Sequence, residues 1–125
     1  MKTIVLIMQR ASLAQGLMGR LGDDPALQLY FEPDYVNADA AIRGHLAQGA
    51  LVEIGEDGPH TADYCLALCR WLREAVSGCK LIVMCPESQP QAVEQVVAAK
   101  RGGQIDDFVF YDVSLDYLVA CLQAL

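Results

Sequence analysis

The stretch LIVMCPESQPQAVEQVVAAKRGGQIDDFVF, residues 81–110, decides the fold class. It opens with five apolar residues at 81–85 and returns to an apolar run at 108–110 after Gly102-Gly103. Between these runs lie apolar residues at helical spacing, namely Ala92, Val93, Val96 and Val97. Continuously apolar strands on either side of a helix are typical of a parallel β–α–β unit, because helices cover both faces of such a sheet. The stretch therefore predicts an α/β protein.

The same alternation extends along the whole chain. Apolar runs predict strands at 3–8, 26–31, 50–54, 81–85 and 108–110, with 26–31 the most polar and so nearest an edge. Helical spacing predicts helices at 12–21, 38–48 (closed by Gly49), from Thr61 to Gly78, at 89–101, and after Ser114, where Thr61 and Ser114 serve as N-caps. Five strand–helix pairs indicate a single flavodoxin-like domain over residues 1–125: a doubly wound, five-stranded parallel sheet in a three-layer α/β/α sandwich.

Charge and composition exclude several classes of function. The 125 residues carry 9 Lys+Arg against 16 Asp+Glu, a net charge of -7, and only Lys100-Arg101 clusters basic charge. We therefore expect no nucleic-acid binding and no attraction to anionic membranes. The apolar run at 4–8 is too short for a membrane span or a signal peptide, so a cytoplasmic protein is expected. Five cysteines, mostly in apolar stretches, predict reduced and buried thiols.

In doubly wound sheets, ligands bind outside the carboxyl ends of the strands. Those ends fall at 8–10, 55–57, 85–87 and 111–112. No glycine-rich dinucleotide motif, Walker motif or flavin phosphate loop follows any of them. We therefore expect no cofactor.

The last third of the chain resembles the receiver domain of two-component response regulators. The resemblance lies in Gly103-Gln-Ile-Asp-Asp-Phe108-Val and in Ser114-Leu-Asp-Tyr-Leu118, and the order and length of all five units agree. Receivers hold Mg²⁺ with an acidic pair ending strand one, beside a phosphoacceptor aspartate ending strand three. A hydroxyl residue ends their strand four, and a lysine followed by proline ends their strand five.

None of these receiver residues is present here. The acidic pair falls on Met8 and Gln9, the phosphoacceptor on Gly55, the hydroxyl on Cys85 and the lysine on Tyr111, with Asp112 in place of the proline. A methionine thioether is a poor ligand for Mg²⁺, and glycine has no nucleophile. The resemblance therefore implies a pseudo-receiver: a response-regulator-like signalling module that is not an enzyme, binds no metal and works without phosphorylation.

Two other functions remain open from the sequence. Asp57 follows Gly55 closely enough that a shifted loop could make it a phosphoacceptor in a working receiver of unusual geometry. Cys85 precedes a helix N-terminus, which can lower the pKa of a thiol, so the rim around it could serve a redox or small-molecule function.

Three further groups of residues could carry chemistry. Cys65 and Cys69 share a helix face behind His60, but they occupy an apolar stripe and lack a fourth ligand, so buried thiols are favoured over a metal site. His45 is expected to be a buried or half-buried structural residue. Glu53 lies in an apolar strand, and the sequence predicts a paired carboxylate that reaches Arg10 or the strand end.

Receivers commonly pair through the face formed by helix four, strand five and helix five. In this chain Tyr111, Tyr117 and Cys121 remain on that face once the core stripe of the last helix is assigned. The resemblance therefore predicts a homodimer, or a complex with another protein, through this surface.

Overall fold

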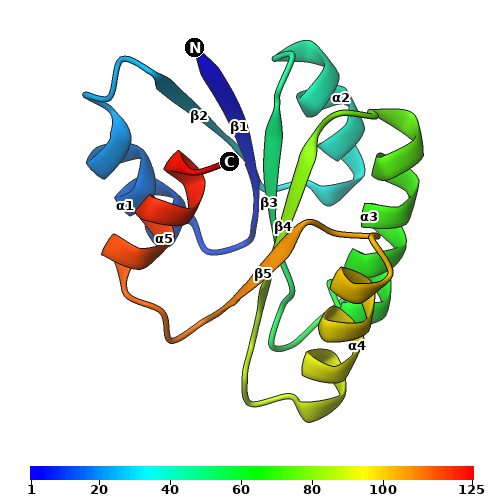
Figure 1. The fold of residues 1–125 in the computed structure, drawn as a ribbon. Coiled ribbons are helices and arrows are strands. Elements are labelled where there is room, and N and C mark those ends of the chain that lie inside the picture. Colours follow the sequence, from blue (N-terminus) through cyan, green and yellow to red (C-terminus); the bar gives the residue numbers. More distant parts are fainter.

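The computed structural model describes residues 1–125 and confirms the predicted fold. Five parallel strands form one sheet in the order β2-β1-β3-β4-β5 (Figure 1). The elements along the chain are β1 (Lys2–Ile7), α1 (Ala11–Leu21), β2 (Leu27–Glu32), the short 3-10 helix η1 (Tyr35–Asn37), α2 (Ala38–Gly44), β3 (Gly49–Glu53), α3 (Ala62–Ala75), β4 (Lys80–Cys85), α4 (Pro90–Arg101), β5 (Asp107–Phe110) and α5 (Leu115–Gln123). The more polar strand β2 is at an edge, as its sequence predicts.

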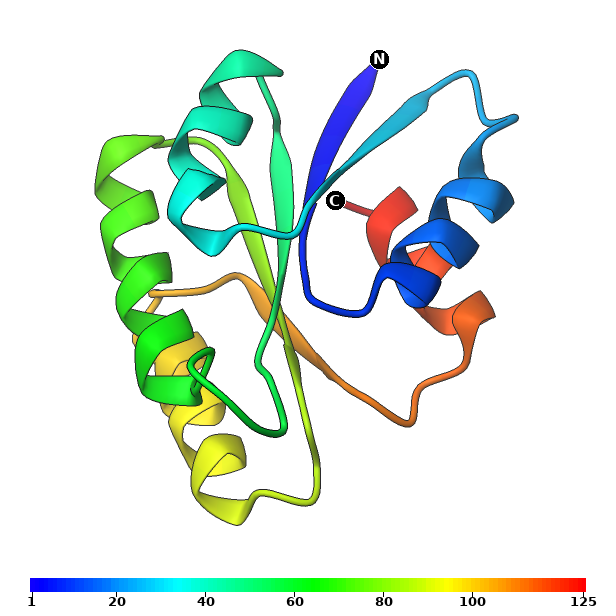
Figure 2. The same ribbon diagram turned by 180° about the vertical axis from the view of Figure 1, so that it is seen from behind.

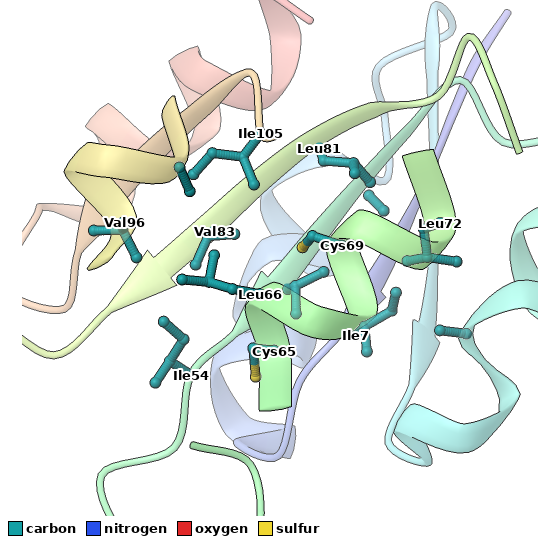
Figure 3. Close-up of a cluster of buried hydrophobic side chains, with 14 of the residues drawn as sticks. Ile7, Ile54, Cys65, Leu66, Cys69, Leu72, Leu81, Val83, Val96 and Ile105 are labelled. Carbon is teal, nitrogen blue, oxygen red and sulfur yellow. The ribbon is translucent and has the colours of Figure 1, made fainter. Parts of the chain in front are cut away.

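Helices cover both faces of the sheet. Helices α1 and α5 lie on one face, and α2, α3 and α4 lie on the other (Figures 1 and 2). Side chains alternate along the strands, so Val5 and Ile7 enter the core under α2–α4 while Ile4 and Leu6 enter the core under α1 and α5. Figure 3 shows the first of these cores, where Cys65 and Cys69 of α3 pack among aliphatic side chains of β3 and β4.

Local sequence signals fix the starts of α3 and α5. The hydroxyl of Thr61 accepts the Tyr64 N–H at 3.2 Å at the start of α3, and the hydroxyl of Ser114 accepts the Tyr117 N–H at 3.1 Å at the start of α5. Both N-caps were predicted from the sequence, because such side chains satisfy backbone donors that a helix leaves unpaired.

The expected helix at 38–48 is wrong at its carboxyl end. Helix α2 ends at Gly44, and Gly49 opens β3 instead of closing the helix. The Ala47 N–H returns to the Ile42 carbonyl at 2.9 Å, which closes the turn and leaves Leu46 at a φ of 53° and fully outside the core. The expectation of a buried or half-buried His45 is wrong: the residue is exposed, and its ring stacks on Tyr30 of β2 with centroids 3.6 Å apart.

Strand β3 also ends one residue earlier than predicted. Glu53 is its last residue, whereas Ile54 was expected to end it, so Glu53 stands at the carboxyl edge instead of within the strand.

The structure contains no helix with the length and apolar character that a membrane span requires.

Candidate functional site at the carboxyl edge of the sheet

The carboxyl ends of β1, β3 and β5 surround a shallow depression at the lower edge of the sheet in Figure 1. Its volume is about 200 Å³, and its lining comes from all three strand ends: Gln9, Arg10, Glu53, Gly55, Glu56, Asp57 and Tyr111. The topology therefore brings together residues more than a hundred positions apart in the sequence, in the place where ligands of such sheets bind.

Glu53 is the central residue of this depression. Its side chain is 1% exposed, and its carboxylate accepts the backbone N–H groups of Gln9 at 2.8 Å and of Arg10 at 3.2 Å. The Arg10 side chain forms an ion pair with the same carboxylate through Nε. A buried carboxylate is costly unless it is paired and hydrogen-bonded, and both conditions are met here. The prediction of a paired Glu53 that reaches Arg10 is confirmed.

Arg10 links Glu53 to the end of β5. Its guanidinium carbon lies 4.1 Å from the centroid of the Tyr111 ring, and Nη2 lies 3.1 Å from the sulfur of Met84. The Tyr111 hydroxyl donates to the Ile54 carbonyl just beyond β3. Burial, and then the negative charge of Glu53, raise the pKa of Tyr111, so its hydroxyl stays a donor at neutral pH. These contacts tie the ends of β1, β3 and β5 together.

Tyr35 is part of the site, although sequence reasoning missed it. Its ring is buried, and its hydroxyl donates to the Glu53 backbone carbonyl at 2.5 Å. His60 stacks on that ring with centroids 3.8 Å apart. Burial raises the pKa of Tyr35, which keeps this donor protonated. The only signal in the sequence is an aromatic residue shortly after an edge strand, which does not indicate a contact with β3.

The structure brings only some of the five predicted switch positions together. Gln9, Gly55 and Tyr111 line the depression. Met8 is buried in the core under α1 and α5, while Cys85 is buried in the core on the opposite face of the sheet.

The loop after β3 carries Gly55 and the fallback residue Asp57. Gly55 lies past the end of the strand, where its N–H bonds to the His60 carbonyl at 2.7 Å. A Cβ at Gly55 would lie 3.0 Å from the Asp57 carbonyl oxygen, which explains a glycine in this tight loop. Asp57 itself is exposed on the rim. The acidic side chain that actually ends β3 is therefore Glu53.

The four buried cysteines lie in surroundings that suppress thiol reactivity. Cys85 is fully buried, and burial together with Glu87 raises its pKa to about 11. Burial raises the pKa of Cys69 to about 12, and the Cys65 thiol lies 3.6 Å from the Glu53 carbonyl oxygen. Because the thiolate is the nucleophile and the metal ligand, these environments disfavour redox and metal chemistry at neutral pH. No group of three or more His, Cys, Asp or Glu side chains is arranged to hold a metal ion.

Tyr111, Tyr117 and Cys121 do not form one surface. Tyr111 is turned towards Arg10 and Ile54, whereas Tyr117 is 56% exposed on α5 and Cys121 is partly exposed one turn further along that helix.

No protein-family model and no curated protein sequence matches the chain. Solved structures do match it. A DNA-binding response regulator of the LuxR family from Staphylococcus aureus aligns with a TM-score of 0.76 and 15% identity, over 99% of this chain and 98% of that one. A response regulator from Thermotoga maritima aligns with a TM-score of 0.77 and 17% identity, over 98% and 95% of the two chains. An adenylate cyclase from Rhodopirellula baltica aligns with a TM-score of 0.81 and 16% identity, over 98% and 85%. The chain thus has the flavodoxin-like α/β fold of response-regulator receiver domains.

Proposed function

We propose that this protein is a receiver-fold signalling module that works without phosphorylation and acts by binding other proteins or a second copy of itself. The observation that carries this proposal is the state of Glu53. Its carboxylate ends β3, two residues before Gly55, where the resemblance places the receiver phosphoacceptor, and Arg10 already neutralises it.

The contacts of Glu53 leave little room for phosphoryl chemistry. One carboxylate oxygen accepts two backbone N–H groups, and the other is paired with the Arg10 guanidinium. A nucleophilic carboxylate needs an accessible oxygen, and this side chain is almost completely buried. The neighbouring end of β1 offers no second carboxylate, because its residues are Met8 and Gln9. Met8 is buried in the core, and the Gln9 amide donates to the Pro33 carbonyl. Mg²⁺ prefers carboxylate oxygens in octahedral geometry, which these two residues do not provide.

Asp57 supports the second candidate, a working receiver with unusual geometry. It is an exposed carboxylate on the rim of the same depression as Glu53. The loop that holds it lacks a neighbouring lysine or arginine to offset charge on a transferred phosphoryl group, since Arg10 is engaged by Glu53. We therefore favour the phosphorylation-independent module.

Intact-mass spectrometry after incubation with acetyl phosphate and Mg²⁺ tests the proposal. We expect no added phosphoryl group on the wild type, on Asp57→Ala or on Glu53→Gln. A receiver domain with its acidic residues intact, run in parallel, reports that the donor is active. An adduct that disappears in Asp57→Ala would establish the working receiver instead, and one that disappears only in Glu53→Gln would show that the Arg10 pair opens in solution.

The face formed by α4, β5 and α5 is our candidate for the partner surface. Tyr117 is the large exposed apolar side chain of this region, with Cys121 beside it. Lys100 and Asp107 form an ion pair at 3.0 Å with both side chains about half exposed, and the Lys100 amine lies 5.8 Å from the Phe108 ring centroid. A face that carries one charge of each sign can match a second copy of itself about a twofold axis, which supports a homodimer.

A further inference from the structure

Helices α3 and α4 lie side by side on one face of the sheet (Figures 1 and 2), and an open groove runs between them. The part near the first turns of both helices has a volume of about 610 Å³, and the part further along has about 430 Å³. Asp63 and Gln95 line both parts, and the hydrogen bond between their side chains stands where the two parts adjoin. The groove is separate from the site around Glu53, since the two share no lining residue.

Neutral hydrogen-bonding side chains dominate the walls of this groove. The side chains with amide or hydroxyl groups are Thr61, Ser88, Gln89, Gln91, Gln95 and Gln104, and the floor of the further part is formed by Leu66, Ala98 and Ala99. A glutamine amide both donates and accepts hydrogen bonds, as a peptide backbone does along its length. The walls of the groove therefore suit an extended peptide better than a phosphate chain, which only accepts.

The lining of the groove carries one side chain of each charge, Arg70 and Asp63, and only the arginine has no partner. Arg70 lines the further part and is exposed, yet it belongs to none of the six ion pairs and makes no side-chain hydrogen bond. The only carboxylate in the lining is Asp63, which accepts a hydrogen bond from the Gln95 amide. At the opposite end, the first turn of α4 carries no acidic residue and adds the partial positive charge of a helix N-terminus, whereas Asp63 offsets that of α3. Although the chain has a net charge of -7, a negatively charged ligand in this groove would find an unpaired cation.

We infer that the α3–α4 groove binds an extended, acidic peptide segment of a partner protein. The amides of Gln91 and Gln104 pair with the peptide backbone, since those of Gln89 and Gln95 already donate to the Glu56 carbonyl and to Asp63. Arg70 pairs with a carboxylate of the peptide. A nucleic acid is disfavoured, because binding one takes a cluster of basic residues and the groove offers a single free arginine. This inference goes beyond the proposed function and is independent of it, because it uses the opposite side of α4 from the face that carries Tyr117.

A nuclear magnetic resonance titration of the ¹⁵N-labelled full chain tests this inference. The probe is a nine-residue peptide of alternating Glu and Ala with blocked ends, and a matching peptide of alternating Lys and Ala is the charge control. We expect the acidic peptide to shift the amide signals of 61–66, 88–95 and 98–104, and the Lys peptide to leave them in place. Arg70→Ala should weaken binding by about two- to five-fold, the range for an exposed ion pair.

Arg101→Ala is the matched control, because Arg101 is also exposed and unpaired but lies outside the lining of the groove. The affinity of the Arg101→Ala variant for the acidic peptide should equal that of the wild type. The dispersion of the spectra shows that each variant is folded. Equal losses in both variants, shifts on another face, equal binding of the Lys peptide, or no shifts at all would overturn the inference. Shifts at these positions that follow protein concentration without any peptide would assign the groove to a second copy of the chain, which also contradicts it.

Discussion

A buried carboxylate at Glu53 is stable because its charge is balanced within the same edge of the sheet. The partners come from the first residues after β1, so the strand order places them beside β3 without any loop rearrangement. Arg10 is 41% exposed, so its outer half stays hydrated while Nε contacts the carboxylate. A pair of this kind costs less desolvation than a fully buried one, and it removes the free negative charge that a phosphoryl transfer site requires.

Arg10→Ala should therefore destabilise the fold by about 2 kcal/mol, because it leaves a buried carboxylate with only its two backbone donors. The double variant Arg10→Ala/Glu53→Gln should recover about 1 kcal/mol of that loss, since no unpaired charge remains. Urea unfolding followed by circular dichroism measures the free energy of unfolding of both variants and of Glu53→Gln alone. If the double variant lost the sum of the two single losses, the two side chains would be energetically independent, and the pair would not hold this edge together.

Among the elements, α2 has the least regular end. Its last turn places Leu46 at a φ of 53° with the side chain 83% exposed. A non-glycine residue in this left-handed region is strained, whereas glycine is not. Leu46→Gly should thus stabilise the protein by about 0.5–1 kcal/mol. Leu46→Ala is the control that removes the same exposed side chain but keeps the strain, and thermal unfolding compares the two. A stabilisation of equal size in Leu46→Ala would trace the effect to the lost apolar surface instead.

Elements whose signals are local could be predicted from the sequence, whereas contacts between elements could not. Thr61 and Ser114 predict the starts of their helices, because an N-cap is a hydrogen bond between residues close in sequence. The Glu53–Arg10 pair could be anticipated because a carboxylate inside an apolar run needs a partner. His45 was assigned to the core because helical spacing continues past Gly44, while the turn that ends α2 depends on where β3 begins. The Tyr35 hydroxyl reaches the Glu53 carbonyl, and the Tyr111 hydroxyl reaches the Ile54 carbonyl. These contacts join different elements, so no residue spacing in the sequence predicts them.

At the scale of the whole molecule, charge decides how two copies can meet. A net charge of -7 repels a second copy in most orientations, so an interface must use a face that is locally balanced. The α4–β5–α5 face meets this condition through Lys100 and Asp107, and Tyr117 supplies exposed apolar surface beside them. The α3–α4 groove, in contrast, offers an unpaired cation and suits a partner that is acidic.

We therefore expect a homodimer that Tyr117→Glu weakens by at least about tenfold, because two new carboxylates would be buried close to each other at the twofold axis. Light scattering coupled to size exclusion, at about 50 micromolar and in a dilution series, measures the association constant, since oligomerisation follows mass action. Trp71→Glu is the matched control: Trp71 is 52% exposed on α3, away from this face, and its substitution should leave the dimer intact. A wild type that is monomeric throughout would refute the homodimer. A dimer that Trp71→Glu disrupts and Tyr117→Glu does not would move the interface off α5 and onto the outer surface of α3.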